Sequence, residues 1–254
     1  MIRLDNGVLR AGIGARGAEL LSLCGGDGTE YIWQRDSRYW DRSAPILFPY
    51  VGRLGSGRCT FDGREYRLPL HGFAPESEFA VVERTDASVI LALADSAQTR
   101  ACFPFRFLLR VRYALEERTL SVAVEVENRG KGPMYFGLGG HPGIRVPLAP
   151  GLRFEDYRVV FKSPCAPQRI VLGEDRLISG RAEPFPLVDG RVLPLQRSLF
   201  NVDAVVLTGM ADALTIGTPG DSHAVTVAYP GVPYVGLWQT ARSDAAFLCV
   251  EPWY

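Results

Sequence analysis

The chain contains only three histidines, His71, His141 and His223. An imidazole has a reference pKa of about 6.5, so it can give and take a proton near neutral pH. The three side chains could also hold a metal ion. No pair, however, has the H-x-H or H-x-x-x-H spacing that places two imidazoles on one ion from a single element. The sequence therefore favours proton transfer at these positions, and we expect no metal site.

Two of the histidines lie in loops typical of functional sites. His71 lies in Pro69–Ala74 and His141 lies in Phe136–Gly143. Both follow an apolar strand and are flanked by Gly or Pro, which lets the backbone approach a ligand closely. The alternative is that each is a structural histidine bonded to a loop carbonyl. His223 follows a Pro-Gly turn, and we expect it to be exposed.

A carboxylate near the end of the chain is a second candidate for proton chemistry. Glu251 ends the apolar run of Phe247–Trp253. A carboxylate at the end of a buried strand is costly unless it is paired or used. Burial would raise its pKa, and hydrogen-bond donors would lower it. The alternative role is a structural salt bridge, for which Arg53 is a candidate partner.

Other residues are suited to binding hydroxyl groups. Arg53 lies on a Gly-rich turn at the end of Pro45–Arg53, and its fork of donors suits sugar hydroxyls or a carboxylate. Asp203 precedes an apolar run and is expected at the mouth of a strand, or else simply forms a turn. Trp238 could stack on the apolar face of a sugar, or belong to the core. The other aromatic candidates are Trp33, Trp40, Trp253, Tyr50 and Phe73.

The elements that must position these residues read as strands. The segments Phe105–Tyr113 and Leu120–Glu127 alternate apolar and polar residues, which is the period of a half-buried strand. In the second segment Leu120, Val122, Val124 and Val126 are expected to face the core. The shorter segments Ala213–Ile216 and Ala224–Tyr229 follow the same pattern.

Turn signals separate the strands. Asn6-Gly7, Asp62-Gly63 and Asp189-Gly190 are dipeptides that favour the positive φ angles of two-residue hairpin turns. The third is expected to join strands over Phe185–Val188 and Arg191–Leu195. Only Asp95–Cys102 suggests a helix, of one or two turns. We predict an all-β, mainly antiparallel protein of about fifteen or more short strands, forming one domain of packed sheets over residues 1–254.

Composition limits the classes of partner. Among 254 residues, Lys plus Arg and Asp plus Glu number 28 each, so the formal net charge is zero. This balance argues against a nucleic acid or an anionic membrane as the main partner. There is no membrane-length apolar run and no secretory signal at the start. The five cysteines are widely spaced without a C-x-x-C motif, so we expect reduced thiols and a cytoplasmic location, as a monomer or homodimer.

The order of five blocks along the chain resembles the aldose 1-epimerase family, also called galactose mutarotase-like proteins. The blocks are Pro45–Arg53, Leu70–Ala74, Gly139–Pro142, Leu199–Asp203 and Phe247–Trp253. The resemblance implies an antiparallel β-supersandwich that binds a monosaccharide and interconverts its α and β anomers by opening and closing the ring. It implies no cofactor, because the reaction needs neither redox chemistry nor a metal.

Carried over by motif, His141 would be the general acid and Glu251 the general base. Arg53, His71 and Asp203 would bind hydroxyls and orient the ring, and we add Trp238 as a sugar contact. We expect the sugar to lie between His141 and Glu251, since in direct contact the two would form an ion pair.

Two alternatives remain. One is a hexose-6-phosphate 1-epimerase, in which the motif His-Gly-Phe-Ala is usually followed by arginine; here Pro75 follows Ala74, which speaks against it. The other is a non-catalytic carbohydrate-binding protein, because sandwich folds host many functions. Such a protein would have no use for an acid and base pair.

Overall fold

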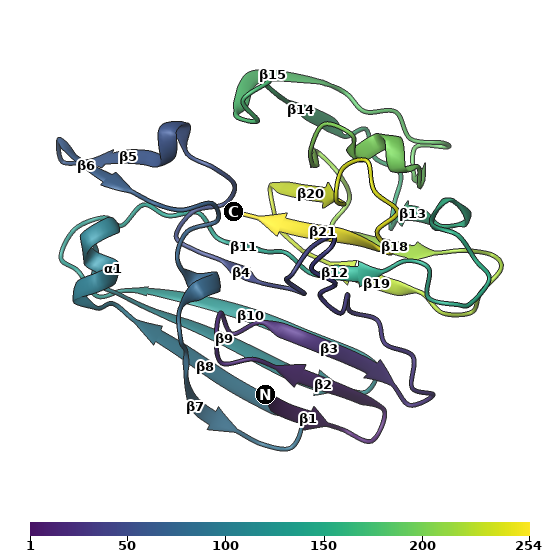
Figure 1. Ribbon diagram of the computed structural model, residues 1–254, viewed down its shortest axis with the longest axis horizontal. Helices are drawn as coiled ribbons and strands as arrows, with labels where there is room; N and C mark the ends of the chain where they lie inside the picture. The colour runs from purple at the N-terminus through teal and green to yellow at the C-terminus, as the bar shows by residue number, and fades with distance from the viewer. The chain divides into compact units, whose positions relative to one another are not determined.

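A computed structural model describes residues 1–254 (Figure 1). Its elements are strands β1 to β21, one α-helix, α1 (Ala97–Cys102), and four short 3-10 helices. The strands of each sheet described below pair antiparallel, so the predicted all-β, antiparallel fold class is confirmed. No helix is long and apolar enough to cross a membrane.

The chain divides into two compact units, each built from two stretches of sequence. Unit 1 comprises Met1–Thr29 and Ala44–Gly139, and unit 2 comprises Glu30–Ser43 and Gly140–Tyr254. The short strand β11 (Gly139–Gly140) lies at the division between them. The segment Glu30–Ser43 thus interrupts the sequence of unit 1 and belongs to unit 2.

Unit 1 contains two main sheets. One has the order β1-β2-β3 and the other the order β10-β9-β8-β7, while β5 and β6 form a separate hairpin (Figure 1). The bounds are β1 (Ile2–Asp5), β2 (Leu9–Ile13), β3 (Leu20–Gly25), β4 (Ile46–Leu47), η1 (Gly55–Gly57), β5 (Arg58–Phe61), β6 (Arg64–Arg67), η2 (Ala74–Glu76), β7 (Ala80–Arg84), β8 (Ser88–Ala94), β9 (Phe107–Glu116) and β10 (Thr119–Asn128).

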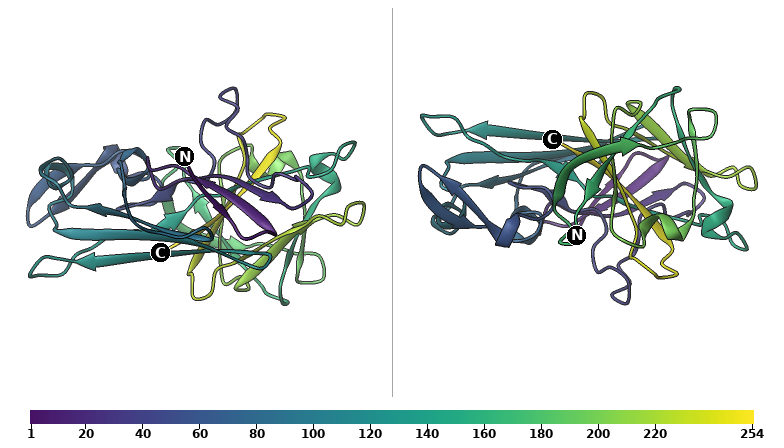
Figure 2. Two further views of the ribbon diagram at one scale, coloured as in Figure 1. Left: turned by 90° about the horizontal axis from the view of Figure 1, so that it is seen from below. Right: turned by 90° about the horizontal axis from the view of Figure 1, so that it is seen from above.

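Alternate residues of β9 form the core of unit 1. Phe107, Leu109, Val111 and Tyr113 are all buried, as their alternation predicts. The Tyr113 hydroxyl donates a 2.8 Å hydrogen bond to the carbonyl of Ala18, just before β3. The buried phenol is thus satisfied while it ties the β7–β10 sheet to the chain entering β3. The long β9–β10 hairpin, in teal, is visible in both views of Figure 2.

The prediction that the apolar face of β10 is buried was wrong in part. Val122 is 47% exposed, and Leu120, Val124 and Val126 are only half-buried. The register pairs Val122 with Tyr113, so these residues do share a face with the core of β9. They are more exposed because β10 is the edge strand of its sheet.

Two of the predicted hairpin dipeptides have the expected backbone. Asp62 and Gly63 have φ angles of 47° and 75°, and Asp189 and Gly190 have 50° and 65°. The strand predicted over Phe185–Val188 is wrong, since only an isolated bridge joins Val188 to Val192 there. Pro186 lacks the N–H that a strand ladder requires, so the pairing of β15, which runs to Pro184, does not continue through it.

Unit 2 also contains two sheets. One has the order β15-β14-β17-β20-β21, with β12 paired to β21, and the other has the order β16-β13-β18-β19. The bounds are β12 (Gly143–Arg145), η3 (Phe154–Asp156), β13 (Arg158–Phe161), β14 (Gln168–Leu172), β15 (Ile178–Pro184), β16 (Val192–Pro194), η4 (Arg197–Phe200), β17 (Val205–Thr208), β18 (Ala213–Gly217), β19 (Val225–Ala228), β20 (Tyr234–Trp238) and β21 (Phe247–Trp253).

Candidate active site

Strand β21 is buried on both faces and places a carboxylate inside unit 2. Every residue from Phe247 to Glu251 is buried. Because side chains alternate along a strand, Phe247, Cys249 and Glu251 point to one face. An unbroken apolar run before Glu251 is therefore what a strand enclosed on both sides requires.

The pairing of β12 with β21 brings His141 to Glu251. Gly143 is paired with Cys249, and the Val250 N–H donates to the Pro142 carbonyl at 3.1 Å. In an antiparallel pair, this register places His141 opposite Glu251. The His141 Nε2 and the Glu251 Oε2 lie 3.3 Å apart, within ion-pair distance.

This pair is shielded from water. The side chains of His141 and Glu251 are only 8% and 2% exposed. Burial raises the pKa of Glu251 well above its usual range, and the negative charge of Asp203 raises it further, while the Trp253 indole opposes the shift in part. A carboxylate with a raised pKa is a stronger base in its ionised form.

Two tryptophans enclose the imidazole. Trp40 stacks on His141 with ring centroids 4.8 Å apart and planes at 28°. Trp238 meets it edge-on, with centroids 5.6 Å apart and planes at 80°. The two rings restrict the imidazole to one orientation.

The segment that supplies Trp40 is fixed to β12 by backbone hydrogen bonds. The Trp33 N–H donates to the Gly143 carbonyl and the Gly143 N–H donates to the Ser43 carbonyl, both at 2.8 Å. A Cβ atom at Gly143 would lie 2.9 Å from the Trp40 ring and 3.2 Å from the Ser43 carbonyl. Glycine at this position therefore permits the close approach of this segment.

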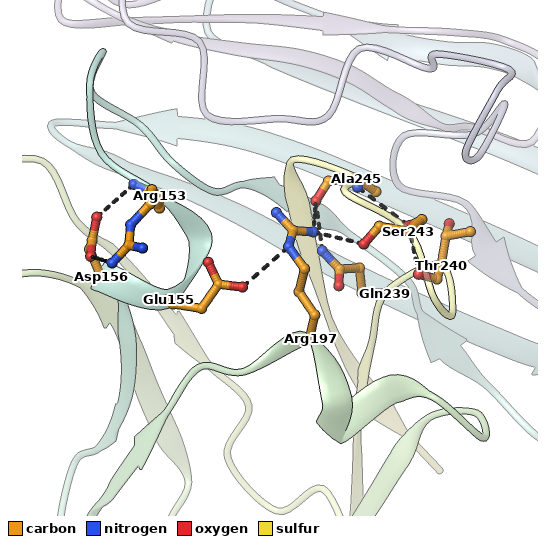
Figure 3. Close-up of polar contacts among 8 residues, drawn as sticks. All are labelled: Arg153, Glu155, Asp156, Arg197, Gln239, Thr240, Ser243 and Ala245. Carbon is orange, nitrogen blue, oxygen red and sulfur yellow. Dashed lines mark hydrogen bonds and ion pairs between the residues drawn. The ribbon is translucent and has the colours of Figure 1, made fainter.

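The connection between β20 and β21 is held by a polar network around Arg197 (Figure 3). The Arg197 guanidinium donates to the carbonyls of Ser243 and Ala245 at 3.1 and 2.8 Å, and lies 3.3 Å from the Glu155 carboxylate. The buried Gln239 amide donates to the Ala245 carbonyl at 2.6 Å. The network fixes the loop between Trp238 and β21, so it positions both sides of the site.

The structure places Asp203 near this pair. Asp203 is half-buried, its Oδ1 accepts from the Ala204 N–H at 2.9 Å, and its Oδ2 lies 3.6 Å from the Arg176 guanidinium. It follows η4 and precedes β17, as the expected strand mouth requires. Its charge acts on Glu251, so a second carboxylate borders the candidate site.

The remaining predicted residues, Arg53 and His71, belong to unit 1 and lie beside each other. The His71 N–H donates to the Gly52 carbonyl at 2.9 Å, and the Gly52 N–H donates to the His71 Nδ1 at 3.1 Å. His71 has a φ of 63°, which is uncommon for a residue with a side chain. Arg53 follows Gly52 directly and is exposed.

The hydrogen bond to Nδ1 determines how His71 can act. A ring nitrogen that accepts from a backbone N–H has no proton of its own, so the proton of neutral imidazole lies on Nε2. Nε2 is then a donor suited to a ligand oxygen. The bond at Nδ1 comes from a backbone donor, so the expected alternative of a ring bonded to a loop carbonyl could apply only at Nε2.

Sequence reasoning missed two residues of the site. Trp40 was considered only as one of several aromatic candidates, and no local signal links it to His141. Cys249 had a signal, because it lies two residues before Glu251 on a strand and must share its face. We expected a sugar to hold His141 and Glu251 apart. In the structure the two side chains are in direct contact.

A sequence model of the aldose 1-epimerase family matches residues 1–183. The chain belongs to this family. The matched range includes Arg53, His71 and His141 and ends before Asp203, Trp238 and Glu251.

Individual relatives match over nearly the whole chain. The chromosomal protein LacX of Lactococcus lactis subsp. lactis is 30% identical over 261 residues, covering 99% of this chain and 87% of LacX. A galactose mutarotase related enzyme from Lactobacillus acidophilus has a TM-score of 0.95 and 31% identity, covering 100% of this chain and 85% of that chain. A galactose mutarotase-like protein from Lactobacillus casei ATCC 334 has a TM-score of 0.92 and 34% identity, covering 100% and 87%. The predicted family resemblance and galactose mutarotase-like fold are confirmed.

Proposed function

We propose that this protein is an aldose 1-epimerase that interconverts the α and β anomers of a free monosaccharide. The observation that supports the proposal most strongly is the buried pair of His141 and Glu251, whose side-chain atoms lie 3.3 Å apart. Ring opening needs one proton removed from the C1 hydroxyl and one given to the ring oxygen. These two oxygens share a carbon, so the base and the acid that serve them must lie close together.

In the proposed reaction, ionised Glu251 takes the proton of the C1 hydroxyl while protonated His141 gives its proton to the ring oxygen. The bond between C1 and the ring oxygen breaks and an open-chain aldehyde forms. Rotation about the C1–C2 bond presents the other face of the carbonyl. The ring then closes as the two groups reverse their roles, so no net proton is consumed.

The remaining predicted residues would bind and orient the sugar. Asp203 borders the pair and can accept hydrogen bonds from hydroxyls, and Trp238 presents an aromatic surface beside His141. For Arg53 and His71 the support is the family motif, together with an exposed guanidinium and a ring proton assigned to Nε2. The proposal of a reducing, cytoplasmic location rests on the wide spacing of the five cysteines and the lack of a C-x-x-C motif.

Anomer exchange tests the proposal directly. Two-dimensional NMR exchange or polarimetry would follow the mutarotation of glucose, galactose and other aldoses with and without protein. We expect the protein to exceed the buffer rate. His141→Asn and Glu251→Gln should each remove about 10²–10⁴-fold of the enzymatic rate, the usual value of one positioned proton transfer.

Three other outcomes would each reject part of this interpretation. Faster turnover of hexose 6-phosphates than of free hexoses would favour the phosphate-specific alternative, against which Pro75 speaks. Saturable sugar binding without acceleration would indicate a carbohydrate-binding protein. Full activity in both variants, with folding verified by circular dichroism, would exclude His141 and Glu251 as the acid and base.

A further inference from the structure

A thiol lies beside the proposed acid and base. Cys249 shares a face of β21 with Glu251, and it is fully buried. One ligand atom from each of His141, Cys249 and Glu251 can be chosen so that all three lie within 4.8 Å of one another. The reaction proposed above makes no use of the thiol. A nitrogen, a sulfur and an oxygen donor therefore converge at one buried point.

We propose that His141, Cys249 and Glu251 form a three-ligand site for a borderline-soft divalent ion such as Zn²⁺, and that the bound ion blocks epimerase activity. The inhibitory part rests on the proposed function, whereas the metal site itself does not. The ion would occupy the imidazole nitrogen and the carboxylate oxygen that the proton transfers need.

The geometry is close to that of a tetrahedral zinc site. Zinc bonds of about 2.0–2.1 Å to nitrogen and oxygen and about 2.3 Å to sulfur place tetrahedral ligands roughly 3.3–3.6 Å apart. The distance from His141 Nε2 to Glu251 Oε2 is 3.3 Å, which already matches one edge. The thiol lies within 4.8 Å, so it needs to move by at most about 1.2–1.5 Å to reach the tetrahedral edge lengths. The fourth position would remain open to water or an inhibitor.

The donor set indicates which ions the site would prefer. Thiolate and imidazole ligands select Zn²⁺, Co²⁺ and related ions, whereas Mg²⁺ and Ca²⁺ prefer oxygen. In the bound state Cys249 is a thiolate, Glu251 is a carboxylate and His141 is a neutral imidazole, and the protons that these groups carried before binding are released to solvent. The doubly charged ion, one thiolate and one carboxylate then sum to zero. A site without net charge is the arrangement that a dry interior tolerates best.

Cobalt provides a readout that does not depend on catalysis. Metal-free protein, treated with a chelator and then dialysed, would be titrated with Co²⁺ in the absence of sugar. We expect one equivalent to produce a sulfur-to-cobalt charge-transfer band and the intense visible bands of tetrahedral Co²⁺, which one equivalent of Zn²⁺ should abolish.

Variants distinguish this site from adventitious binding. Cys249→Ala and Cys249→Ser should each lose the charge-transfer band and weaken Zn²⁺ binding in calorimetry more than about 100-fold, beyond the 10–100-fold typical of groups that only support a ligand. His141→Gln should weaken binding similarly, whereas Cys165→Ala in the same unit should change neither the band nor the affinity. Circular dichroism would verify that each variant is folded, and the two substitutions at Cys249 guard against a local packing effect.

Inhibition is then measured as the ratio of anomer-exchange rates with and without Zn²⁺, each variant against its own metal-free rate. Wild type and Cys165→Ala should be inhibited, and the Cys249 variants should be much less sensitive. No band in wild type, or an unchanged band in both folded Cys249 variants, would overturn the site. A band in a protein without epimerase activity would reject the proposed function and leave the metal site intact.

Discussion

The proposed functional residues belong to two regions that differ in construction. In unit 2, His141 and Glu251 project from paired, buried backbone and are almost inaccessible to water. In unit 1, His71 and Arg53 lie on adjoining loop segments, where His71 has positive φ and Arg53 is exposed. The buried pair has the surroundings that shift a pKa, whereas the loop pair offers donors with fixed directions.

This difference follows from what each task requires. A proton carrier needs its pKa adjusted, and burial in a low-dielectric interior does this most strongly. A hydroxyl-binding group needs only to present a donor or acceptor, which a loop does well when its backbone is held. The hydrogen bond from the Gly52 N–H to the His71 ring shows how the loop is held, because the side chain of one loop segment binds the backbone of the other.

Substitution of one residue from each region should separate the two tasks. Glu251→Gln should lower kcat by about 10²–10⁴-fold, because a positioned base is lost. Arg53→Ala should act mainly on KM, raising it by about 10- to 150-fold, the equivalent of one charged hydrogen bond worth about 1.5–3 kcal/mol. Kinetics of anomer exchange over a range of sugar concentrations would measure both constants. A fall in kcat for Arg53→Ala as large as that for Glu251→Gln would remove the distinction.

The loop of unit 1 that carries His71 should be sensitive to an added methyl group on its backbone. A Cβ atom at Gly72, where φ is 76°, would lie 2.3 Å from the carbonyl oxygen of Phe48, so we expect Gly72→Ala to cost about 3 kcal/mol or more in unfolding free energy. Gly63 is the matched control, with φ of 75° and no atom within 4 Å. Gly63→Ala should cost only about 1–2 kcal/mol, the strain of a left-handed residue. Equal losses in urea denaturation would show that backbone strain alone determines the cost.

The network of unit 2 gives a smaller expected effect. Arg197→Ala removes a hydrogen-bond donor from the Ser243 carbonyl and one of the two donors of the Ala245 carbonyl, which keeps its bond from Gln239, and we expect a loss of about 1–3 kcal/mol in unfolding free energy. The exposed pair of Arg153 and Asp156, also drawn in Figure 3, is the control, and Arg153→Ala should cost clearly less than Arg197→Ala because solvent screens the pair. Arg197→Ala should in addition lower kcat, because the loop between Trp238 and β21 loses its support. An Arg197→Ala protein with normal kcat would mean that the sheet alone positions the site.

The sequence predicted best what depends on neighbours along the chain. The burial of Phe107 to Tyr113 and the positive φ angles of Asp62 and Asp189 follow from alternation and turn chemistry, and the structure agrees. The exposure of Val122 could not be predicted in this way. Its alternation is that of a core strand, but its burial depends on its position at the edge of a sheet, which is a property of the tertiary fold.

The candidate site shows the same limit. The motifs singled out His141 and Glu251, and the register of β12 on β21 explains why residues so far apart in sequence meet. Trp40 could not be linked to them from the sequence. It belongs to the segment Glu30–Ser43, which packs with unit 2, and no local sequence pattern identifies the strand against which this segment packs. Cys249 could have been found from its spacing to Glu251, but a cysteine in an apolar run is usually only a small core residue.

The smallest expected effect is a difference in how pH changes stability in the two regions. Burial raises the pKa of Glu251 above its ordinary value of 4.5, so the folded state retains a proton that the unfolded chain has released. Its contribution to stability must therefore decline as the pH rises from about 4.5 toward the folded pKa. Glu127 in unit 1 has the opposite sign, because hydrogen bonds from Arg129 and Arg110 lower its pKa, so its contribution is present above 4.5 and is lost as the pH falls.

Urea denaturation between pH 4 and pH 8 would measure this contrast. Relative to wild type, Glu251→Gln should become progressively more stable as the pH rises, because glutamine has no proton to lose. Glu127→Gln should show a small deficit at neutral pH that disappears in acid. The exposed Glu127 pair is screened by solvent, so its curve should be shallower than that of Glu251. A flat difference between wild type and Glu251→Gln across this range would mean that folding does not change the proton occupancy of Glu251, and the contrast in sign with Glu127 would then be lost.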